Sequence, residues 1–418
     1  MKKTFLFLVA AMVVATASAA DKVTVTVSNS LKTARSGELV EVDAAKVKSL
    51  LGATSIVVKD ADGREVPSQI TYDGKLIFQV GVAAKGKSIY YVSEGTPAEY
   101  EPKVFGRQFP ERVDDIAWEN DVVAYRCYGP ALQRNGEKAY GYDVWNKRTS
   151  KLVVEERYAN ELNPDIQRAM AKLRSLSEGD LADDIYNAVS YHVDHGNGMD
   201  CYKVGSTLGC GTSALLDSKG NIVYPYCYVD YDILDKGPLR FTVRLQYGKE
   251  TVDGVEVTET RVVSLDAGSH LNKAVVSYKG MTKALPFASG IVIHNENQKG
   301  FFLNPELGYM GYEDRGDPNQ YKEKYRYEQN DDFGKIFVGV VMPQAGVKME
   351  YKEEKGLPGA TGHILASTTL QPETAITYYF GSGWNRNPET DILSLTDWEA
   401  YLSQFSELVK SPLKVTIK

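Results

Sequence analysis

Polar and apolar residues alternate along much of the chain, as they do in half-buried β-strands. The stretch "KVTVTVSN" at residues 22–29 shows this pattern, and "SIVVKDADGREVPSQITYDGKLIFQV" predicts strands separated by turns at 60–63 and 73–74. We therefore expect residues 20–100 to form a small all-β domain. The next residues are rich in proline, glycine and charge, so residues 101–113 are predicted to be a linker.

Residues 114–418 hold longer strand candidates that follow one another like hairpins, without the strand–helix alternation of a parallel sheet. This order predicts a large antiparallel sandwich. The candidates are "DVVAYRCYGPAL", "KLVVEERY", "LRFTVRLQYG", "VEVTETRVVSL", "KAVVSYKG", "SGIVIHN", "KIFVGVVMP", "GHILASTTL" and "TAITYYFGSGW".

Two helices are predicted to interrupt these strands. The first begins at Asn163–Pro164, a capping residue followed by proline, and carries apolar residues at helical spacing from Ile166 to Leu176. The second is "SLTDWEAYLSQFSELV", which starts near Thr396 or Asp397 and has one apolar face. We expect this C-terminal helix to pack back on the sandwich.

The start of the chain predicts export. Lys2 and Lys3 precede an apolar stretch and the small residues "ASA", so residues 1–19 are expected to be a signal peptide and the mature protein to be periplasmic or secreted. No later run of about 20 apolar residues occurs, and we expect no membrane insertion. The net charge of −7, without a basic stripe, argues against a nucleic-acid partner. The oligomeric state stays open.

The chain has four cysteines, Cys127, Cys201, Cys210 and Cys227. Export permits disulfides, and Cys201 and Cys210 are close enough in sequence to pair, although three full connectivities remain open. The 27 tyrosines and 4 tryptophans supply faces that stack on sugar rings. Tyrosine is also a favourable strand residue, so composition alone does not decide between these readings.

The densest polar motif is "YHVDHGNGMDCYKVGSTLGCG" at residues 191–211. Its five glycines imply a repeatedly turned chain, but turns need neither two histidines nor a lysine. We interpret it as a site loop at one end of the sandwich; the alternative is a glycine-rich connection with solvated charges. Its candidate residues are His192, Asp194, His195, Asp200, Tyr202 and Lys203.

Imidazole titrates near neutral pH, so His195 is the main general acid/base candidate, with His192 as a second. Asp194 or Asp200 would orient the base. A metal site built from these histidines and aspartates is a weaker alternative, because the spacing is not that of an HExxH motif.

A second candidate is "RVDDIAWENDVVAYRCYGP", in which Asp115 and Glu119 flank Trp118 and Arg126 follows on the next strand. Stacking, hydroxyl recognition and anion pairing would make this a sugar subsite. The alternative is a polar hairpin around a packed tryptophan. Glycoside hydrolysis would need two carboxylates, for which Glu119 and Asp200 are candidates.

Further candidates come from the ends of strands. His294 follows "GIVI", and Trp384 and Arg386 in "GSGWNRNPE" form a plausible binding edge. His270 is read as a turn residue, and His363 as the start of a strand. No cofactor is expected, apart from weak Ca²⁺ binding by "GYEDRGDPNQ", whose spacing is not that of an EF-hand. Nucleotide-binding and serine-hydrolase motifs are absent from the sequence.

Several of these stretches together resemble the DUF4861 family: "DDIAWENDVVAYRCYGPAL", "YDVWNKR", "HVDHGNGMDCYKVGSTLGCG", "YYFGSGWNR" and "DWEAYL". The resemblance covers most of residues 114–418. It implies an exported protein of Bacteroides-type bacteria, often encoded among polysaccharide-degradation genes, with a galactose-mutarotase-like β-supersandwich. That superfamily includes sugar epimerases, polysaccharide lyases and sandwich domains of glycosidases. The resemblance transfers no catalytic residue, because the family's activity is unassigned.

Two hypotheses follow. The first is a carbohydrate-active enzyme that acts on a uronic-acid-containing glycan substrate. As a lyase it would use His195 as base, Tyr202 as acid, and Arg126 or Lys203 to neutralise the uronate; a hydrolase would use paired carboxylates, and an epimerase His195 with a carboxylate. The second hypothesis is a non-catalytic glycan-binding protein.

Overall fold

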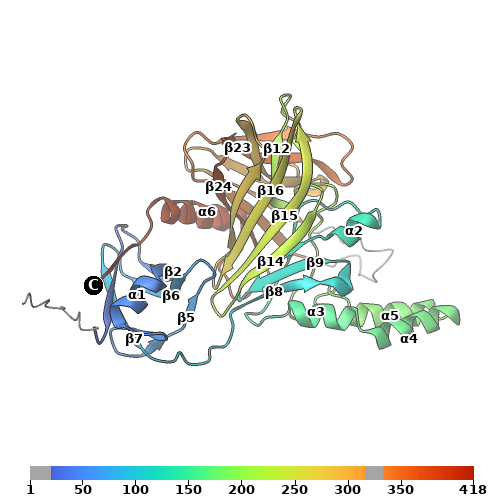
Figure 1. The fold of residues 1–418 in the computed structure, drawn as a ribbon. Coiled ribbons are helices and arrows are strands. Elements are labelled where there is room, and N and C mark those ends of the chain that lie inside the picture. Colours follow the sequence, from blue (N-terminus) through green and yellow to red (C-terminus); the bar gives the residue numbers. More distant parts are fainter. Residues whose placement is uncertain (1–19, 316–332) are drawn as a thin grey trace, which may run out of the picture.

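The computed structural model describes residues 20–315 and 333–418. The expected signal peptide and the second half of "GYEDRGDPNQ" lie outside these residues. Within them, no helix is long and apolar enough to cross a membrane. The described chain is mainly β, and Figure 1 shows a small N-terminal unit beside a large sandwich.

The N-terminal unit packs two antiparallel sheets around a core of valines and other aliphatic residues. In the strand "VTVTVS" every second side chain is buried, as its alternation predicts. An unpredicted helix, α1 (Ala44–Leu51), begins where the Asp43 side chain accepts a hydrogen bond from the Lys46 amide. The strands are β1 (Val23–Ser28), β2 (Arg35–Asp43), β3 (Ile56–Lys59), β4 (Glu65–Val66), β5 (Ser68–Ile70), β6 (Lys75–Val82) and β7 (Lys87–Glu94).

The end of the chain returns to this unit. Strand β25 (Lys414–Ile417), which we had assigned to the second domain, pairs antiparallel with β1, so that Val25 lies opposite Ile417. The two ends of the described chain are therefore hydrogen-bonded neighbours. This pairing ties the N-terminal unit to the helix that precedes β25.

The large unit is an antiparallel β-supersandwich, as predicted. One layer is an eight-stranded sheet in the order β14-β15-β16-β17-β24-β21-β20-β19. Its strands are β14 (Tyr228–Lys236), β15 (Arg240–Val252), β16 (Val255–Asp266), β17 (Leu271–Lys279), β19 (Phe301–Asn304), β20 (Tyr309–Arg315), β21 (Lys335–Val341) and β24 (Ala375–Trp384).

The opposing layer consists of a five-stranded and a four-stranded sheet, joined where Tyr142 bridges Gly209. The five-stranded sheet contains β12 (Cys210–Leu216), β13 (Ile222–Val223), β18 (Leu285–His294), β22 (Lys348–Glu353) and β23 (Ala360–Leu370). The four-stranded sheet contains β8 (Val104–Phe109), β9 (Asp115–Asn120), β10 (Ala124–Cys127) and β11 (Tyr142–Trp145). Strand β8 thus lies within the predicted linker.

Every strand candidate in the large unit overlaps an observed strand except "KLVVEERY". That prediction is wrong, because this segment forms most of helix α3 (Val154–Glu161). The buried Glu119 carboxylate accepts hydrogen bonds from the amides of Val153 and Val154, both at 2.7 Å. This distant side chain caps the helix, which local β-propensity does not reveal.

Both predicted helices are confirmed. Asn163 caps α4 (Pro164–Ser175), and Ser394 caps α6 (Leu395–Lys410), which packs Trp398 and Leu402 against the outer side of the eight-stranded sheet. The structure adds α2 (Pro130–Arg134) and α5 (Gly179–Val189). Figure 1 shows α3, α4 and α5 below β8 and β9, at one end of the molecule.

A tight backbone contact holds the layer junction. A Cβ atom on Gly141 would lie 2.2 Å from the carbonyl carbon of Leu208. We predict that Gly141→Ala lowers the free energy of unfolding by about 3 kcal/mol. The new Cβ would clash with backbone atoms, which cannot move aside as the end of a flexible side chain can. The control is Gly179→Ala, where nothing lies within 4 Å of the new Cβ. Denaturant unfolding followed by circular dichroism checks this, and equal midpoints for the two variants would contradict it.

Candidate functional site

The loop at residues 190–209 lies along β11 as an irregular extra strand. The amide of Asn146 donates to the Met199 carbonyl at 2.9 Å, and the Met199 amide donates to the Asn146 carbonyl at 3.0 Å. Gly198, with φ of +98°, is required here because a Cβ would lie 2.1 Å from the Asn146 oxygen. This register fixes where Asp200 and the residues after it enter the sandwich.

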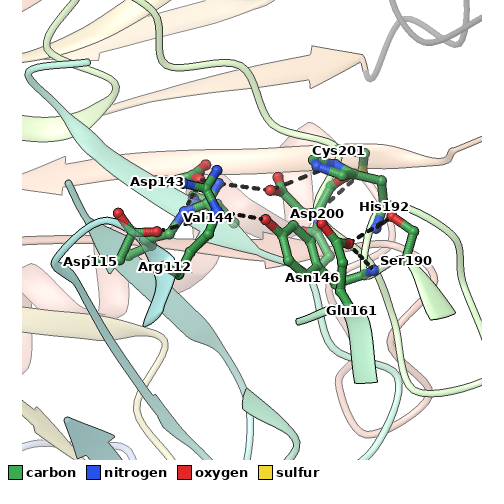
Figure 2. A network of polar contacts seen from close by, with 12 residues as sticks. Arg112, Asp115, Asp143, Val144, Asn146, Glu161, Ser190, His192, Asp200 and Cys201 are labelled. Carbon is green, nitrogen blue, oxygen red and sulfur yellow. Dashed lines mark hydrogen bonds and ion pairs between the residues drawn. The ribbon is translucent and has the colours of Figure 1, made fainter. Parts of the chain in front are cut away.

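Arg126 is the centre of a buried polar cluster. Its guanidinium donates to Asp143 through Nε at 2.9 Å, to Asp200 at 2.8 Å and to the Tyr128 hydroxyl at 2.9 Å. Figure 2 shows Asp143 and Asp200, from β11 and from the loop, within this network. Burial raises the pKa of Asp143 to about 6, and the charge of Asp200 adds to the shift. Burial likewise raises the pKa of Asp200, against the opposing charge of Arg126.

Asp115 borders the same cluster and is completely buried. The Tyr158 hydroxyl donates to it at 3.2 Å, and Arg126 Nη1 lies 4.0 Å from its Oδ2. In the described part of the chain, Asp115 Oδ1 and Arg126 Nη1 have no hydrogen-bond partner. Burial raises the pKa of Asp115 to about 7. Asp115 and Arg126 are thus enclosed by protein and do not form an open sugar subsite.

The two histidines of the loop face different surroundings. His192 Nδ1 lies 3.1 Å from the Asp200 carbonyl and 3.7 Å from Asp200 Oδ2, next to the Arg126 cluster. His195 is exposed, and its Nε2 lies 3.0 Å from the Ser190 carbonyl. Within the described residues neither Asp194 nor Asp200 contacts the His195 ring. The expected orientation of His195 by an aspartate is therefore not found.

A second polar cluster forms where β18 ends. His294 Nδ1 lies 3.0 Å from each carboxylate oxygen of Asp314 on β20, and the His294 amide donates to the Tyr312 hydroxyl at 3.2 Å. Burial alone would lower the pKa of His294, but the charge and hydrogen bond of Asp314 outweigh it and raise that pKa. Among the described residues, Nε2 has no hydrogen-bond partner.

The loop brings Tyr202 and Lys203 to this dyad. The Tyr202 ring packs edge-on against His294, with centroids 5.8 Å apart. Its hydroxyl is buried without a hydrogen-bond partner in the described residues, and burial holds its pKa well above the ordinary range. Lys203 is partly exposed, and its charge acts on His294. A histidine fixed by a carboxylate thus lies beside a neutral phenol and an accessible ammonium.

Two candidates from "IAWEN" have structural roles instead. Trp118 is completely buried, and its indole donates to Asn272 at 2.7 Å, so it cannot stack on a sugar. Glu119 is equally buried, because Lys147 pairs with it at 2.7 Å while it caps α3. Glu119 is therefore unavailable as half of a catalytic carboxylate pair.

The predicted binding edge at the end of β24 is also packed inside. Trp384 is 2% exposed, and its indole donates to the Phe333 carbonyl at 2.8 Å. The guanidinium of Arg386 lies 5.6 Å from the Trp384 ring centroid. The pair therefore covers the end of the core and presents no open aromatic face.

The remaining histidines are buried. Burial lowers the pKa of His270 to about 4, and its Nδ1 lies 2.8 Å from the Ser382 carbonyl. His363 Nδ1 lies 2.5 Å from Glu354, which leaves Nε2 to accept the Leu208 amide at 3.1 Å. His363 thereby anchors the far end of the loop.

The disulfide that the sequence allowed between Cys201 and Cys210 is not present, since all four cysteines are buried free thiols. Over residues 20–315 and 333–418, no group of three or more His, Cys, Asp and Glu residues is placed to hold a metal ion. The metal alternative for His192, Asp194, His195 and Asp200 is therefore not supported.

Sequence reasoning overlooked two central carboxylates. Asp143 stands in "YDVWNKR", quoted only for the family resemblance, and Asp314 was read as part of a calcium loop. For Asp143 the signal was a lone aspartate within the apolar strand "YDVW", since a buried charge requires a partner. Asp314 stands between Glu313 and Arg315, so its sequence carried no such signal.

The fold and the His294–Asp314 cluster together define a β-supersandwich protein with a His–Asp dyad where strand β18 ends. The family model "Domain of unknown function (DUF4861)" matches residues 27–415, so the chain belongs to the DUF4861 family. "Uncharacterized protein P7" of Formosa agariphila is 24% identical over 414 residues, which cover 94% of this chain and 93% of that protein.

Two solved structures from Enterococcus faecalis are similar in architecture. One is an alpha-mannosidase of strain V583, with a TM-score of 0.45, 10% identity and coverage of 95% of this chain and 46% of the other. The second is a protein in the glycosyl hydrolase family 38, with a TM-score of 0.46, 9% identity and coverage of 95% and 47%. This chain spans about half the length of each. Such low similarity carries no information about activity.

The raised pKa of Asp115 predicts a pH-dependent stability. The unfolded carboxyl ionises near its ordinary pKa of 3.8, whereas the folded one keeps its proton up to about pH 7. The folded state therefore loses stability as pH rises from about 4 to about 7. We predict that Asp115→Asn removes this loss. The stability of the variant relative to the parent should therefore be on the order of 4 kcal/mol greater at pH 8 than at pH 4.

Asp194 supplies a control of opposite sign. Burial opposes its ionisation, but hydrogen bonds from Arg148 and from the amides of Gly198 and Gly196 lower its pKa. Asp194→Asn should therefore cost stability at neutral pH and less in acid. Thermal unfolding at several pH values measures both variants. Parallel pH profiles for the parent and Asp115→Asn would rule out a raised pKa.

Proposed function

We propose that this protein is an exported carbohydrate-active enzyme that cleaves uronic-acid-containing glycans by β-elimination. The main supporting observation is the His294–Asp314 dyad beside Lys203 and beside the Tyr202 hydroxyl, which has no hydrogen-bond partner among the described residues. These side chains supply a base, an acid and a cation, the three groups that elimination from a uronate requires. Relative to the sequence hypothesis, the base moves from His195 to His294.

In this mechanism the ammonium of Lys203 pairs with the uronate carboxylate and stabilises the charge that develops next to it. His294 Nε2 removes the proton from the carbon that bears the carboxyl group. The Tyr202 hydroxyl donates its proton to the leaving glycosidic oxygen. A double bond then forms between the carbon that lost the proton and the neighbouring carbon that lost this oxygen. Asp314 holds the imidazole through Nδ1, which leaves Nε2 for the substrate, and stabilises the imidazolium, as a carboxylate does in a catalytic triad.

The buried carboxylates favour elimination over hydrolysis. Glu119 is occupied by Lys147 and α3, and Asp200 by Arg126. Hydrolysis would require two carboxyl groups that face the glycosidic bond with room for water or a sugar carbon. Arg126 already pairs with two aspartates, which leaves Lys203 as the partner of the substrate carboxylate.

Export belongs to the same proposal. It rests on the N-terminal pattern of positive, apolar and small residues. The implied association of the DUF4861 family with polysaccharide degradation outside the cytoplasm agrees with it. A glycan polymer would be met in the periplasm or beyond the cell.

We predict that His294→Ala and Tyr202→Phe each lower the rate of elimination by about 10³-fold, the usual contribution of a general acid or base. The purified mature protein is assayed on pectic and other uronic-acid oligosaccharides by the ultraviolet absorbance of unsaturated uronates, with chromatography of the products. Tyr202→Phe is the sharper variant. Its lost hydroxyl has no hydrogen-bond partner in the described structure, so stability should not fall.

His195→Ala is the matched control, because this exposed histidine belongs to the same loop and should leave the rate unchanged. Asp314→Asn should reduce the rate while substrate binding persists. Products without ultraviolet absorbance would instead indicate hydrolysis. Binding without any product would identify a glycan-binding protein, and full activity of Tyr202→Phe would exclude the proposed acid.

A further inference from the structure

A cavity lies between the N-terminal unit, α6 and the outer side of the eight-stranded sheet, and no residue of the dyad lines it. Its volume is about 520 Å³, within the range of about 300–1,000 Å³ of small-molecule sites. Figure 1 shows α6 between the N-terminal unit and the sandwich, where it closes one side of this cleft. None of the candidate residues discussed above lines the cleft.

The floor of the cleft is a row of side chains across three neighbouring strands. Ser264 on β16 pairs with Lys273 on β17, which pairs with Tyr379 on β24. Directly paired residues point to the same face, with Cβ atoms about 5 Å apart. A hydroxyl, an ammonium and an aromatic ring are thus placed side by side over roughly the breadth of two sugar rings.

The aromatic end of this row continues onto α6. The Phe405 ring packs edge-on against Tyr379, with centroids 5.1 Å apart, and stacks on Tyr401 at 6.2 Å with an angle of 30° between the ring planes. Tyr379 remains partly exposed, and burial raises its pKa, as do the charges of Asp266 and Glu41. It is therefore a neutral phenol with an accessible ring, suited to stacking against a sugar.

The charges around the cleft leave one cation available. Arg240 pairs with Asp266 at 2.6 Å and with Glu41 at 2.7 Å, and Arg35 pairs with Glu38. Lys273 is exposed and forms no ion pair within the described residues. These fixed ion pairs offer hydrogen bonds to hydroxyl groups, whereas Lys273 offers its full charge to an anion.

We propose that this cleft is a non-catalytic binding site for a short acidic oligosaccharide. A sugar ring stacks on Tyr379, a uronate carboxylate pairs with Lys273, and Ser264 and the ion pairs bind hydroxyl groups. The choice of a uronic-acid ligand rests on the proposed function, whereas the cleft and its row of side chains do not.

The test is calorimetric titration of the full mature chain with trigalacturonate and, separately, with neutral cellotriose. The parent protein carries Tyr202→Phe, so that the proposed elimination does not add heat. Lys273→Ala should weaken trigalacturonate binding about tenfold, the loss expected for one charge-assisted contact. Lys273→Arg should largely retain it, and Tyr379→Leu should weaken both ligands.

Lys279→Ala is the matched control. Lys279 is exposed on the same strand and the same face, about 20 Å further along β17. Equal affinities of Lys273→Ala and Lys279→Ala would overturn the proposal, as would absence of trigalacturonate binding to the parent. Equal binding of cellotriose would overturn the acidic ligand. If the protein with Tyr202 intact shows no lyase activity while the titrated protein shows Lys273-dependent binding, the proposed function is refuted and this site stands.

Discussion

The burial of Arg126 is the constraint on which the site depends. A guanidinium cannot lie inside a protein without partners, and removing one partner of a buried ion pair costs about 3–5 kcal/mol. Arg126 takes these partners from β11 and from the glycine-rich loop. The loop is consequently held against β11 at Asp200, and the nearby Tyr202 and Lys203 are carried to the His294–Asp314 dyad. The charge cluster supports the site, while the dyad supplies its reactive groups.

The two clusters differ because their charges are balanced differently. Around Arg126, the carboxylates of Asp115, Asp143 and Asp200 are buried together. The charges of Arg126 and Arg112 oppose the shift, but burial dominates and the three pKa values rise. Such a cluster holds protons tightly and is closed to substrate. At the dyad one carboxylate holds one imidazole, whose second nitrogen has no hydrogen-bond partner among the described residues. Excess negative charge therefore accompanies a structural role here, and a matched pair accompanies the proposed catalytic one.

Periodicity predicted both capped helices and all but one of the nine strand candidates of the large unit, because those signals are local; strands such as β9, β11 and β14 were not predicted. The hairpin order similarly predicted an antiparallel sandwich. Local signals failed at "KLVVEERY", where Glu119 caps the helix from another strand. They also failed at β25, whose partner strand lies at the opposite end of the chain. The site was predicted only in part. The glycine-rich loop does deliver Tyr202 and Lys203, but which histidine they meet depends on the junction of two layers. The prediction that Trp118 stacks on a sugar was wrong, because a tryptophan between carboxylates gives the same sequence pattern whether it is buried or exposed.

The eight-stranded sheet connects both proposed sites through a single rigid body. Along β24, Tyr378 and Phe380 point into the core while Tyr379 points outward into the cleft. One short segment thus stabilises the sandwich and presents a sugar-binding face. On β20 the same alternation directs Asp314 toward His294. Because the sheet fixes the distance between them, a long acidic glycan bound at the cleft would be present at the dyad at a raised effective concentration whenever its length spans the gap. Helix α6 and strand β25 then share a structural role, since they hold the N-terminal unit in place as the far wall of the cleft.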